Sequence, residues 1–450
     1  MTSPPKIRKN VQKSEIPSKY KERTEELTKY PNSKNVLYIT ARDQRIFDNY
    51  CVNLGFELSE QNKSQFYMGC ELNNLKMNER QKAFVVQGLK VVEKDAEKFN
   101  INLFLLKNDL EEFCKKKTVD CIILDFFPLR EYLKRAEEIR MMGERNKIRV
   151  IRVDTHNLVP CRKLDVYKRT GASVKIHLNK QWPCYFGDMP DLKPHKFNKL
   201  EKINNLYPEI NEKLFKYKGG YQTGMKMFDE FCKSRFSNYA DQRNNPNVTV
   251  SSNLSPWVTF GQISPQKIIF LIYKKFVDQD KKNLESFLNE FFIWRETAEH
   301  FVYHEKNYDN INGALDWAKY TLLHHKQDKR KFRYKTTDIE KARTKDELWN
   351  AAQKELVLDG KMHSYVRMYW CKTLLQWFDD PEEALAFSIN LNDSYSIDGN
   401  SPGGYLGCMW SICGSMDRAF KEREIVGKIR PMKTFKCPRY TSKFKDQEIK

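Results

Sequence analysis

Short apolar runs alternate with amphipathic stretches in the first third of the chain. The runs are typical of buried strands and occupy residues 36–40, 103–106, 121–124 and 150–153. The clearest helical periodicity between them is found at residues 83–99 and 129–142. Buried strands that alternate with helices predict a parallel α/β sheet. The first strand runs into the polar segment 40–45, where the carboxyl end of a strand offers a place for a ligand loop. The sequence has no glycine-rich dinucleotide loop there, which argues against NAD.

The second half of the chain has the periodicity of helices. Five stretches suit amphipathic helices, namely 284–301, 314–325, 346–358, 363–378 and 381–391. Between the halves, residues 161–215 are rich in proline and lysine and show little periodicity, as expected of an interdomain linker. The predicted organisation is a flexible basic leader (1–34), an α/β domain (35–160), the linker (161–215), a helical domain (216–440) and a tail (441–450).

Charge and composition restrict the classes of function. The chain has 79 Lys and Arg residues against 59 Asp and Glu, a formal net charge of +20, which favours a polyanionic partner such as nucleic acid. No apolar run of about 18 residues occurs, so no transmembrane helix is expected. Eleven scattered cysteines without a signal-peptide pattern predict an intracellular protein with reduced thiols. Neither the pair Cys408 and Cys413 nor the pair His300 and His304 has the further ligands that a metal site needs, so we expect no metal.

Tryptophans gather in one run of predicted helices. Trp370 and Trp377 are seven residues apart, which places them on one helix face about 10.5 Å apart along its axis, and Trp349 lies in the preceding helix. Aromatic residues at helical spacing are usually core residues. A functional interpretation requires a partner for such a chain of rings, for example a redox cofactor.

Three polar segments suggest binding chemistry. The hydroxyl-rich segment 251–255 precedes a predicted helix, as in many phosphate sites and also in many simple helix caps. Glu290 and Trp294 share a helix face, an arrangement that suits a base held outside its duplex, or a surface glutamate beside a core tryptophan. A glycine-rich segment, 392–417, is followed by a basic run that suits the DNA backbone or forms a solvated face.

Several long segments, in the same order along the chain, resemble class II cyclobutane pyrimidine dimer photolyases of the photolyase/cryptochrome family. In the helical half the similar segments are 252–264, 342–353, 360–370, 391–393 and 404–414. In the α/β half they are 41–45, 125–130 and 153–160. The resemblance extends over roughly residues 36–440.

The resemblance implies a Rossmann-like α/β antenna domain joined to an all-α domain that binds FAD. It further implies a lyase, deoxyribodipyrimidine photo-lyase, in which photoexcited FADH⁻ donates an electron to a cyclobutane pyrimidine dimer and splits it. The implied partner is UV-damaged DNA and not a membrane, and we expect a monomer in an intracellular, DNA-containing compartment, either the nucleus or the cytoplasm. Members of the family also differ in their antenna pigment, which is an 8-hydroxy-5-deazaflavin, a folate or absent.

The resemblance also assigns roles to individual residues. Glu290 matches a hydrogen-bond partner of the flipped thymines, and Asn392 matches the asparagine that faces flavin N5. The photoreduction chain matches Trp349, Trp370 and Trp377. Contacts to the dimer or its DNA are expected from Trp294, Trp410, Met368 and Arg430, the last of which would enter the gap left by the flipped lesion. FAD contacts are expected from Tyr239, Ser251, Ser252, Asn253, Leu254, Ser255, Arg295, Asn392, Asp393 and Asp398.

Two alternatives within the same family remain open, a cryptochrome-like blue-light receptor and a (6-4) photolyase. The chemistry of (6-4) photolyases relies on active-site histidines, and segments 289–296 and 404–414 contain none. Cryptochromes often add a long C-terminal extension, whereas only about ten residues follow Pro438. Both observations favour a dimer photolyase.

Overall fold

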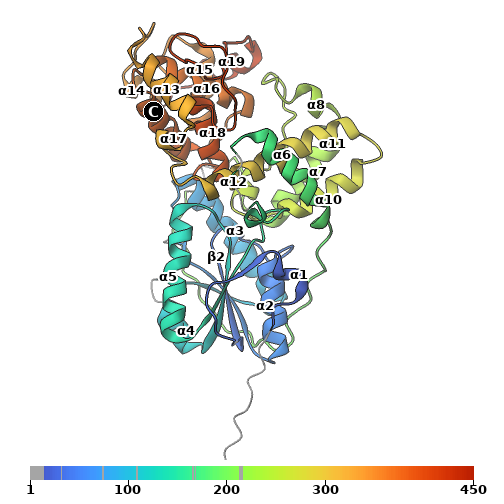
Figure 1. Cartoon of the computed structure of the whole chain (residues 1–450). Helices are drawn as coiled ribbons and strands as arrows, with labels where there is room; N and C mark the ends of the chain where they lie inside the picture. Colours follow the sequence, from blue (N-terminus) through green and yellow to red (C-terminus); the bar gives the residue numbers. More distant parts are fainter. Residues whose placement is uncertain are drawn as a thin grey trace, which may run out of the picture.

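A computed structural model of the chain describes residues 15–31, 33–72, 76–107, 110–164, 167, 169–211 and 216–449, and all structural statements below concern these residues. A six-stranded sheet forms one end of the molecule and a mainly helical domain the other (Figure 1). The strands are β1 (Thr24–Glu26), β2 (Asn35–Thr40), β3 (Phe66–Cys70), β4 (Asn102–Leu105), β5 (Val119–Asp125) and β6 (Arg149–Val153). Their order across the sheet is β1-β6-β5-β2-β3-β4. Only β1, which pairs with β6, is antiparallel to its neighbour.

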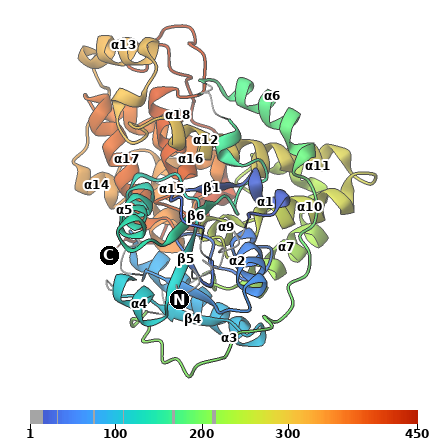
Figure 2. The same cartoon turned by 60° about the horizontal axis from the view of Figure 1, so that its bottom comes forward.

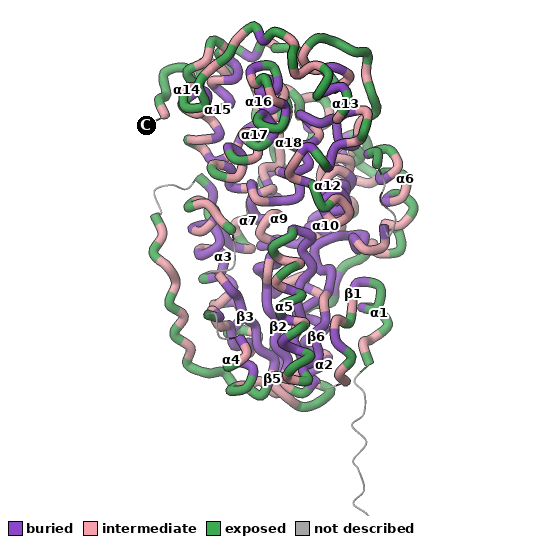
Figure 3. The backbone as a smooth tube through the Cα atoms, turned by 60° about the vertical axis from the view of Figure 1, so that its left-hand side comes forward, coloured by how far each residue is buried: buried purple, intermediate pink, exposed green. Residues whose placement is uncertain are grey.

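Both faces of the sheet are covered by helices, which explains why its central strands are continuous apolar runs. The helices of this domain are α1 (Ser18–Lys21), α2 (Tyr50–Gln61), α3 (Glu79–Lys98), α4 (Leu110–Lys116) and α5 (Arg130–Asn146). Side chains of α2 and α3 pack with Val36 and Tyr38 on one face, and those of α4 and α5 pack with Leu37 and Ile39 on the other. The strands β2, β3, β5 and β6 are accordingly buried along most of their length (Figure 3). The predicted parallel α/β sheet is confirmed.

The prediction of a flexible leader is wrong for residues 18–26. These residues form α1 and β1, and β1 extends the sheet by pairing with β6. The guanidinium of Arg23 anchors the segment, since it donates hydrogen bonds of 2.7 Å to the carbonyl oxygens of Asn157 and Leu158. Long-range contacts of this kind stabilise a polar strand that has no apolar pattern of its own. The first fourteen residues of the predicted leader lie outside the described chain.

The predicted linker is fastened to the sheet rather than loose. It contains helix α6 (Gly171–Gln181), and its later part runs along β4 at the sheet edge. There the side chain of Asn198 accepts a bond from the Phe66 amide (2.7 Å) and donates to the carbonyl oxygens of Phe66 (2.9 Å) and Asn100 (2.6 Å). The amide side chain therefore takes the place of a further peptide group and covers part of the exposed edge.

Replacing Asn198 by alanine should lower the free energy of unfolding by about 2 kcal/mol, because three backbone groups lose their partner. Urea denaturation followed by circular dichroism measures the change. A matched control is Asn312→Ala, whose side chain is exposed and for which a change below about 0.5 kcal/mol is expected. Equal denaturation midpoints for the two variants would show that the hydrogen bonds of the Asn198 side chain contribute nothing to stability.

The helical domain consists of two packed groups of helices that meet at α12 and α18. The first group contains α7 (Tyr221–Ser234), α8 (Tyr239–Gln242), α9 (Ser255–Thr259), α10 (Pro265–Phe276), α11 (Lys281–Leu288), the π-helical turn η6 (Asn289–Trp294) and α12 (Arg295–His304). The second contains α13 (Asp316–His324), α14 (Thr336–Glu340), α15 (Glu347–Asp359), α16 (Ser364–Trp377), α17 (Pro381–Tyr395), α18 (Pro402–Cys413) and α19 (Pro438–Phe444). Each group has its own apolar core. Within the described chain, no helix is both long and apolar enough to cross a membrane.

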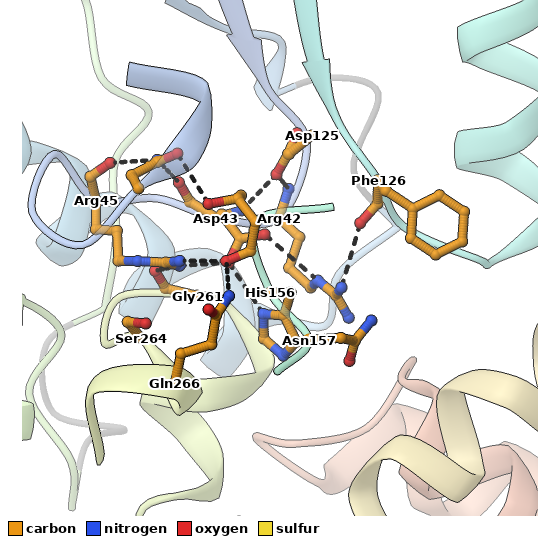
Figure 4. Close-up of polar contacts among 12 residues, drawn as sticks. Arg42, Asp43, Arg45, Asp125, Phe126, His156, Asn157, Gly261, Ser264 and Gln266 are labelled. Atoms are coloured by element: carbon orange, nitrogen blue, oxygen red, sulfur yellow. Dashed lines mark hydrogen bonds and ion pairs between the residues drawn. The ribbon is translucent and has the colours of Figure 1, made fainter. Parts of the chain in front are cut away.

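The two domains are joined by a buried ionic network at the carboxyl end of β2 (Figure 4). The Arg42 guanidinium donates to Glu299 of α12 at 2.6 Å. Arg45 forms an ion pair with Asp43 and donates to the Gly261 carbonyl oxygen at 2.9 Å. Burial alone would raise the pKa of Asp43, but its pairs with Arg45, His156 and Arg42 outweigh burial and lower it. The expectation of a ligand loop at residues 40–45 is therefore wrong for these side chains, which connect the domains instead.

Candidate functional site

Two tryptophans meet where the two groups of helices join. Trp294 ends the π-helical turn η6 and Trp410 lies on α18, and their rings contact edge to face at 5.2 Å and 77°. We call them the aromatic pair. Both are only partly buried, so each presents some ring surface to solvent. A Cβ at Gly171 would lie 2.7 Å from the Trp294 ring, so only glycine allows α6 to begin against the pair. The structure thus brings together the two predicted walls of the lesion pocket.

The candidate glutamate Glu290 lies one turn before the aromatic pair. One of its carboxylate oxygens is 3.0 Å from the guanidinium of Arg243, and it accepts a hydrogen bond from the Asn289 amide group at 3.2 Å. The segment has π-helical rather than the expected α-helical winding, and π turns occur frequently at functional sites. The sequence analysis missed Arg243, because a single arginine 47 positions earlier carries no local signal of this pairing.

The three tryptophans of the predicted redox chain form a continuous series of ring contacts, one stacked and one edge to face, which we call the aromatic chain. The rings of Trp370 and Trp349 are nearly parallel, 6.0 Å apart at 11°, and Trp349 meets Trp377 at 5.0 Å and 60°. The Trp349 indole donates to the Trp370 carbonyl oxygen at 2.9 Å, and the Trp370 indole donates to Gln353 at 3.0 Å. Trp349 therefore lies between the two residues that the spacing placed on one face of α16.

A buried polar cluster surrounds Asp398, and we call it the Asp398 cluster. The carboxylate is 3.2 Å from the guanidinium of Arg367 and accepts hydrogen bonds of 2.6 Å from Ser255 and from Ser396. Lys361 donates to the Ser255 hydroxyl, and its ammonium is 3.8 Å from the Asp398 carboxylate. Burial lowers the pKa of Lys361 to about 8. Burial would raise the pKa of Asp398, but the two cations outweigh it and lower that pKa.

Asn392 and Asp393 lie beside this cluster. The guanidinium of Arg367 donates to the Asn392 side-chain oxygen at 3.3 Å, and the Asn392 amide group donates to Asp393 at 3.1 Å. Asp393 also accepts from the backbone amide of Asn400 at 2.8 Å. Four of the predicted FAD contacts, namely Ser255, Asn392, Asp393 and Asp398, are therefore connected through a single set of hydrogen bonds.

The surroundings of the cluster fit a large polar ligand. Arg367 Nε, His363 Nε2 and Asn400 Oδ1 are buried, and each lacks a hydrogen-bond partner within the described chain. On α18, a Cβ added at Gly403 or at Gly407 would meet no atom within 4 Å. Unpaired donors and acceptors beside an open helix face suit a ligand with ring heteroatoms and phosphates, such as FAD.

The other predicted FAD contacts occupy several environments. Tyr239 and Leu254 are buried in the core of the first group of helices. Ser251, Ser252 and Asn253 are half-buried and lead into α9, and Asn253 has a positive φ of 58°. Arg295 belongs to a different set of contacts, since its guanidinium donates to Asn157 at 2.9 Å and to Glu296 at 2.6 Å, towards the α/β domain.

Met368 and Arg430 are the two most exposed of the candidate DNA contacts. Met368 projects from α16 with 43% of its surface exposed, and α16 packs against α18, which carries Trp410. Arg430 is exposed, and its guanidinium lies 5.6 Å from the centre of the Phe420 ring.

The sequence analysis did not single out two cations of the candidate site, although both lie in a segment that resembles photolyases. Lys361 and Arg367 are both within residues 360–370, one before α16 and one on it. A cation in an otherwise apolar, aromatic segment is a usable signal, because such a charge is buried only when a partner is present. The partner, Asp398, lies more than 30 residues later, and only the fold identifies it.

Comparisons with known proteins point to a single family. A family model described as DNA photolyase matches residues 36–182. A deoxyribodipyrimidine photo-lyase from Arabidopsis thaliana is 35% identical over 432 residues, which cover 90% of this chain and 86% of the plant protein. The crystal structure of a bacterial class III photolyase from Agrobacterium tumefaciens superimposes with a TM-score of 0.66 at 16% identity, covering 85% and 80% of the two chains. A Synechocystis cryptochrome does so with a TM-score of 0.68 at 15% identity, covering 92% and 86%. These two structures share the fold with this chain.

Proposed function

The chain belongs to the DNA photolyase family, and from this premise we propose that it is a class II deoxyribodipyrimidine photo-lyase, which splits cyclobutane pyrimidine dimers in UV-damaged DNA by light. One structural observation carries the proposal. Within four residues of α16, Arg367 contacts the Asp398 cluster, Met368 projects to the outside, and Trp370 begins the aromatic chain. One helix thereby connects a candidate cofactor pocket, a candidate lesion surface and a candidate electron path.

FAD, when bound, supplies the absorption of light and the electron that photolyases deliver to the dimer. In this chain we assign its binding to Ser255, Lys361, Arg367, Asn392 and Asp398, with the segment from Ser251 to Leu254 as the phosphate loop. The Asp398 carboxylate balances Lys361 and Arg367, so the polar atoms of the cluster face a ligand without an unpaired charge among them. The amide side chain of Asn392, fixed by Arg367 and Asp393, is held in one orientation toward the ligand.

The lesion is assigned to the aromatic pair. A base inside a duplex cannot reach a buried cofactor, and a damaged pair costs less to open than an intact one. Once everted, the dimer can stack on Trp294 and Trp410 while Glu290 accepts hydrogen bonds from the pyrimidine N–H groups. The net charge of +20 supplies sequence-independent affinity for the phosphate backbone.

The decisive experiment measures the light-dependent repair of a cyclobutane dimer directly. Full-length protein loaded with FAD and a reductant is mixed with an oligonucleotide that carries one cyclobutane dimer, and the products are separated after blue light. We expect intact thymines in the illuminated sample and none in the dark sample. Repair of a (6-4) product instead of the dimer would contradict the proposal, as would failure of the protein to take up flavin.

Replacing Glu290 by glutamine should lower the affinity for dimer-containing DNA by about tenfold, because a charged acceptor facing the pyrimidines becomes neutral. Fluorescence anisotropy with labelled oligonucleotides measures the change, and repair yield is expected to fall with it. The matched control is Glu285→Gln, an exposed glutamate on α11 whose replacement should leave both quantities unchanged. An unaltered affinity in Glu290→Gln would remove the residue from the lesion site.

A further inference from the structure

Residues Phe420–Arg430 form a closed loop that follows α18 and ends in the exposed Arg430, and we call it the Arg430 loop. Its two sides are joined by the Phe420 amide, which donates to Lys428 at 2.9 Å, and by reciprocal bonds of 3.0 and 2.9 Å between Arg423 and Gly427. The cation–π contact of Arg430 with Phe420 connects the last residue of the loop to its first. The position of the Arg430 guanidinium therefore depends on where the whole loop lies.

The Arg430 loop is docked on α13 and the turn after it, in the part of the helical domain remote from the sheet (Figures 1 and 2). The backbone amide of Ile425 donates to the Asp328 carboxylate at 2.7 Å, and that of Lys428 donates to the Thr321 hydroxyl at 3.0 Å. A Cβ at Gly427 would lie 2.1 Å from the Thr321 hydroxyl, so loop and helix touch without room for a side chain.

His325 bridges the two sides of this contact. Its Nδ1 is 2.6 Å from the Asp328 carboxylate, and its Nε2 is 3.2 Å from the Glu422 carboxylate in the loop. An imidazolium donates to both carboxylates at once. A neutral imidazole has a single N–H, so it donates to one carboxylate and turns a nitrogen lone pair toward the other carboxylate. The bridge is therefore complete only when His325 carries its second proton.

The other charged groups around the bridge leave this dependence on His325 intact. Lys428 approaches Glu422 at 3.9 Å, and Arg330 donates to the carbonyl oxygens of His325 and Asp328 rather than to a carboxylate. The ring of His324 stands perpendicular to that of His325 at 5.2 Å and stacks on Tyr320. None of these three groups adds a hydrogen bond between a carboxylate of the loop and the turn after α13 in the described chain.

We propose that His325 is a positioning residue, whose protonated ring holds the Arg430 loop on α13 and thereby sets Arg430 for entry into the gap left by an everted lesion. The inference rests on the proposed function, from which it takes the role of Arg430. It adds a specific pH dependence to lesion binding.

The sign of that dependence follows from the charges. Partial burial opposes protonation, but the hydrogen bonds that the ring donates to Asp328 and Glu422 outweigh it and raise the pKa of His325. A group whose pKa is raised by docking stabilises the docked state below that pKa and loses this contribution as the pH rises through it. The Arg430 loop is therefore held most firmly at mildly acidic pH.

Hydrogen exchange in the full-length protein without DNA tests the docking. We expect the amides of residues 423–428 to exchange about threefold faster in His325→Gln than in the wild type at pH 6, and at similar rates at pH 8.5. The matched control is His324→Gln, which alters the adjacent histidine and should match the wild type at both pH values. Equal exchange in wild type and His325→Gln at pH 6 would overturn the proposal.

DNA affinity tests whether docking of the Arg430 loop affects lesion binding. Between pH 6 and 8.5, the wild type should lose about threefold more affinity for dimer-containing duplex than His325→Gln loses. Only in the wild type does docking of the Arg430 loop depend on a group, His325, that titrates in this range. Undamaged duplex, which offers no gap, should show no such difference. If His325→Gln alters hydrogen exchange but has the same pH profile of affinity for dimer DNA as the wild type, the assigned role of His325 in lesion binding would be overturned. A wild type without preference for dimer DNA would instead contradict the proposed function, while the exchange result would still decide whether His325 docks the loop.

Discussion

Replacing Trp370 by phenylalanine should slow the photoreduction of bound oxidised flavin at least about a hundredfold, while repair by chemically reduced protein stays near the wild-type level. Trp370 is the member of the aromatic chain nearest in sequence to Arg367, which contacts Asp398, and Trp349 lies between it and Trp377. A phenyl ring is much harder to oxidise than an indole, so the first transfer step is lost although the helix keeps an aromatic residue. A loss of about two powers of ten in rate corresponds to a barrier higher by about 2.7 kcal/mol.

The measurement is the change in flavin absorption under continuous blue light with an external thiol. Trp182→Phe serves as the matched control, because Trp182 packs with Phe186 and Tyr273 in a different part of the domain. Trp377→Phe extends the test, since it removes the far end of the chain and should also slow photoreduction. If Trp370→Phe photoreduces at the wild-type rate, the stack of tryptophans is core packing alone.

The strands of the sheet show what a sequence pattern can reveal. The runs that predicted β2, β4, β5 and β6 were recognisable because strands covered on both faces are continuously apolar. Strand β3, Phe66–Cys70, was missed because its five residues include Met68 and Gly69, which have no strand preference. Strand β1 is polar, and pairing with β6 stabilises it. An edge strand that is stabilised by its partner therefore has little sequence pattern from which it could be predicted.

The candidate site was predictable residue by residue but not as a set of pairs. Family resemblance pointed to Glu290 and Asp398, yet Arg243 and Lys361 appeared only when the chain was folded. Ion pairs join residues far apart in sequence, and no periodicity reports such a pairing. The order of the aromatic chain was hidden for the same reason, because Trp349 belongs to a different helix from its two neighbours.

Replacing Asp398 by asparagine should reduce the affinity for FAD at least about a hundredfold, because the substitution leaves Arg367 and Lys361 buried without their shared carboxylate. Removing one partner of a buried ion pair destabilises the fold by up to about 3–5 kcal/mol, and flavin must then reorder the weakened pocket on binding, at a factor of ten in affinity for each 1.4 kcal/mol. Retention of flavin through gel filtration, followed by titration of the apoprotein, measures the loss. An asparagine keeps one acceptor oxygen, so one of the hydrogen bonds from Ser255 and Ser396 survives while the negative charge is removed.

Lys361 can lose its charge within the experimental pH range, whereas Arg367 stays charged. The pH dependence of flavin affinity therefore distinguishes loss of charge balance from misfolding. Burial already lowers the pKa of Lys361 to about 8, and without Asp398 the opposing attraction disappears, so its pKa should fall further. Lys361 in Asp398→Asn therefore loses its proton near neutral pH, and flavin affinity should partly recover between pH 7 and 9. The double variant Lys361→Met with Asp398→Asn should bind flavin more tightly than Asp398→Asn at pH 7 and show no recovery at higher pH. Affinity that is equally low in both variants at every pH would mean that the carboxylate of Asp398 contacts the cofactor directly rather than balancing its neighbours.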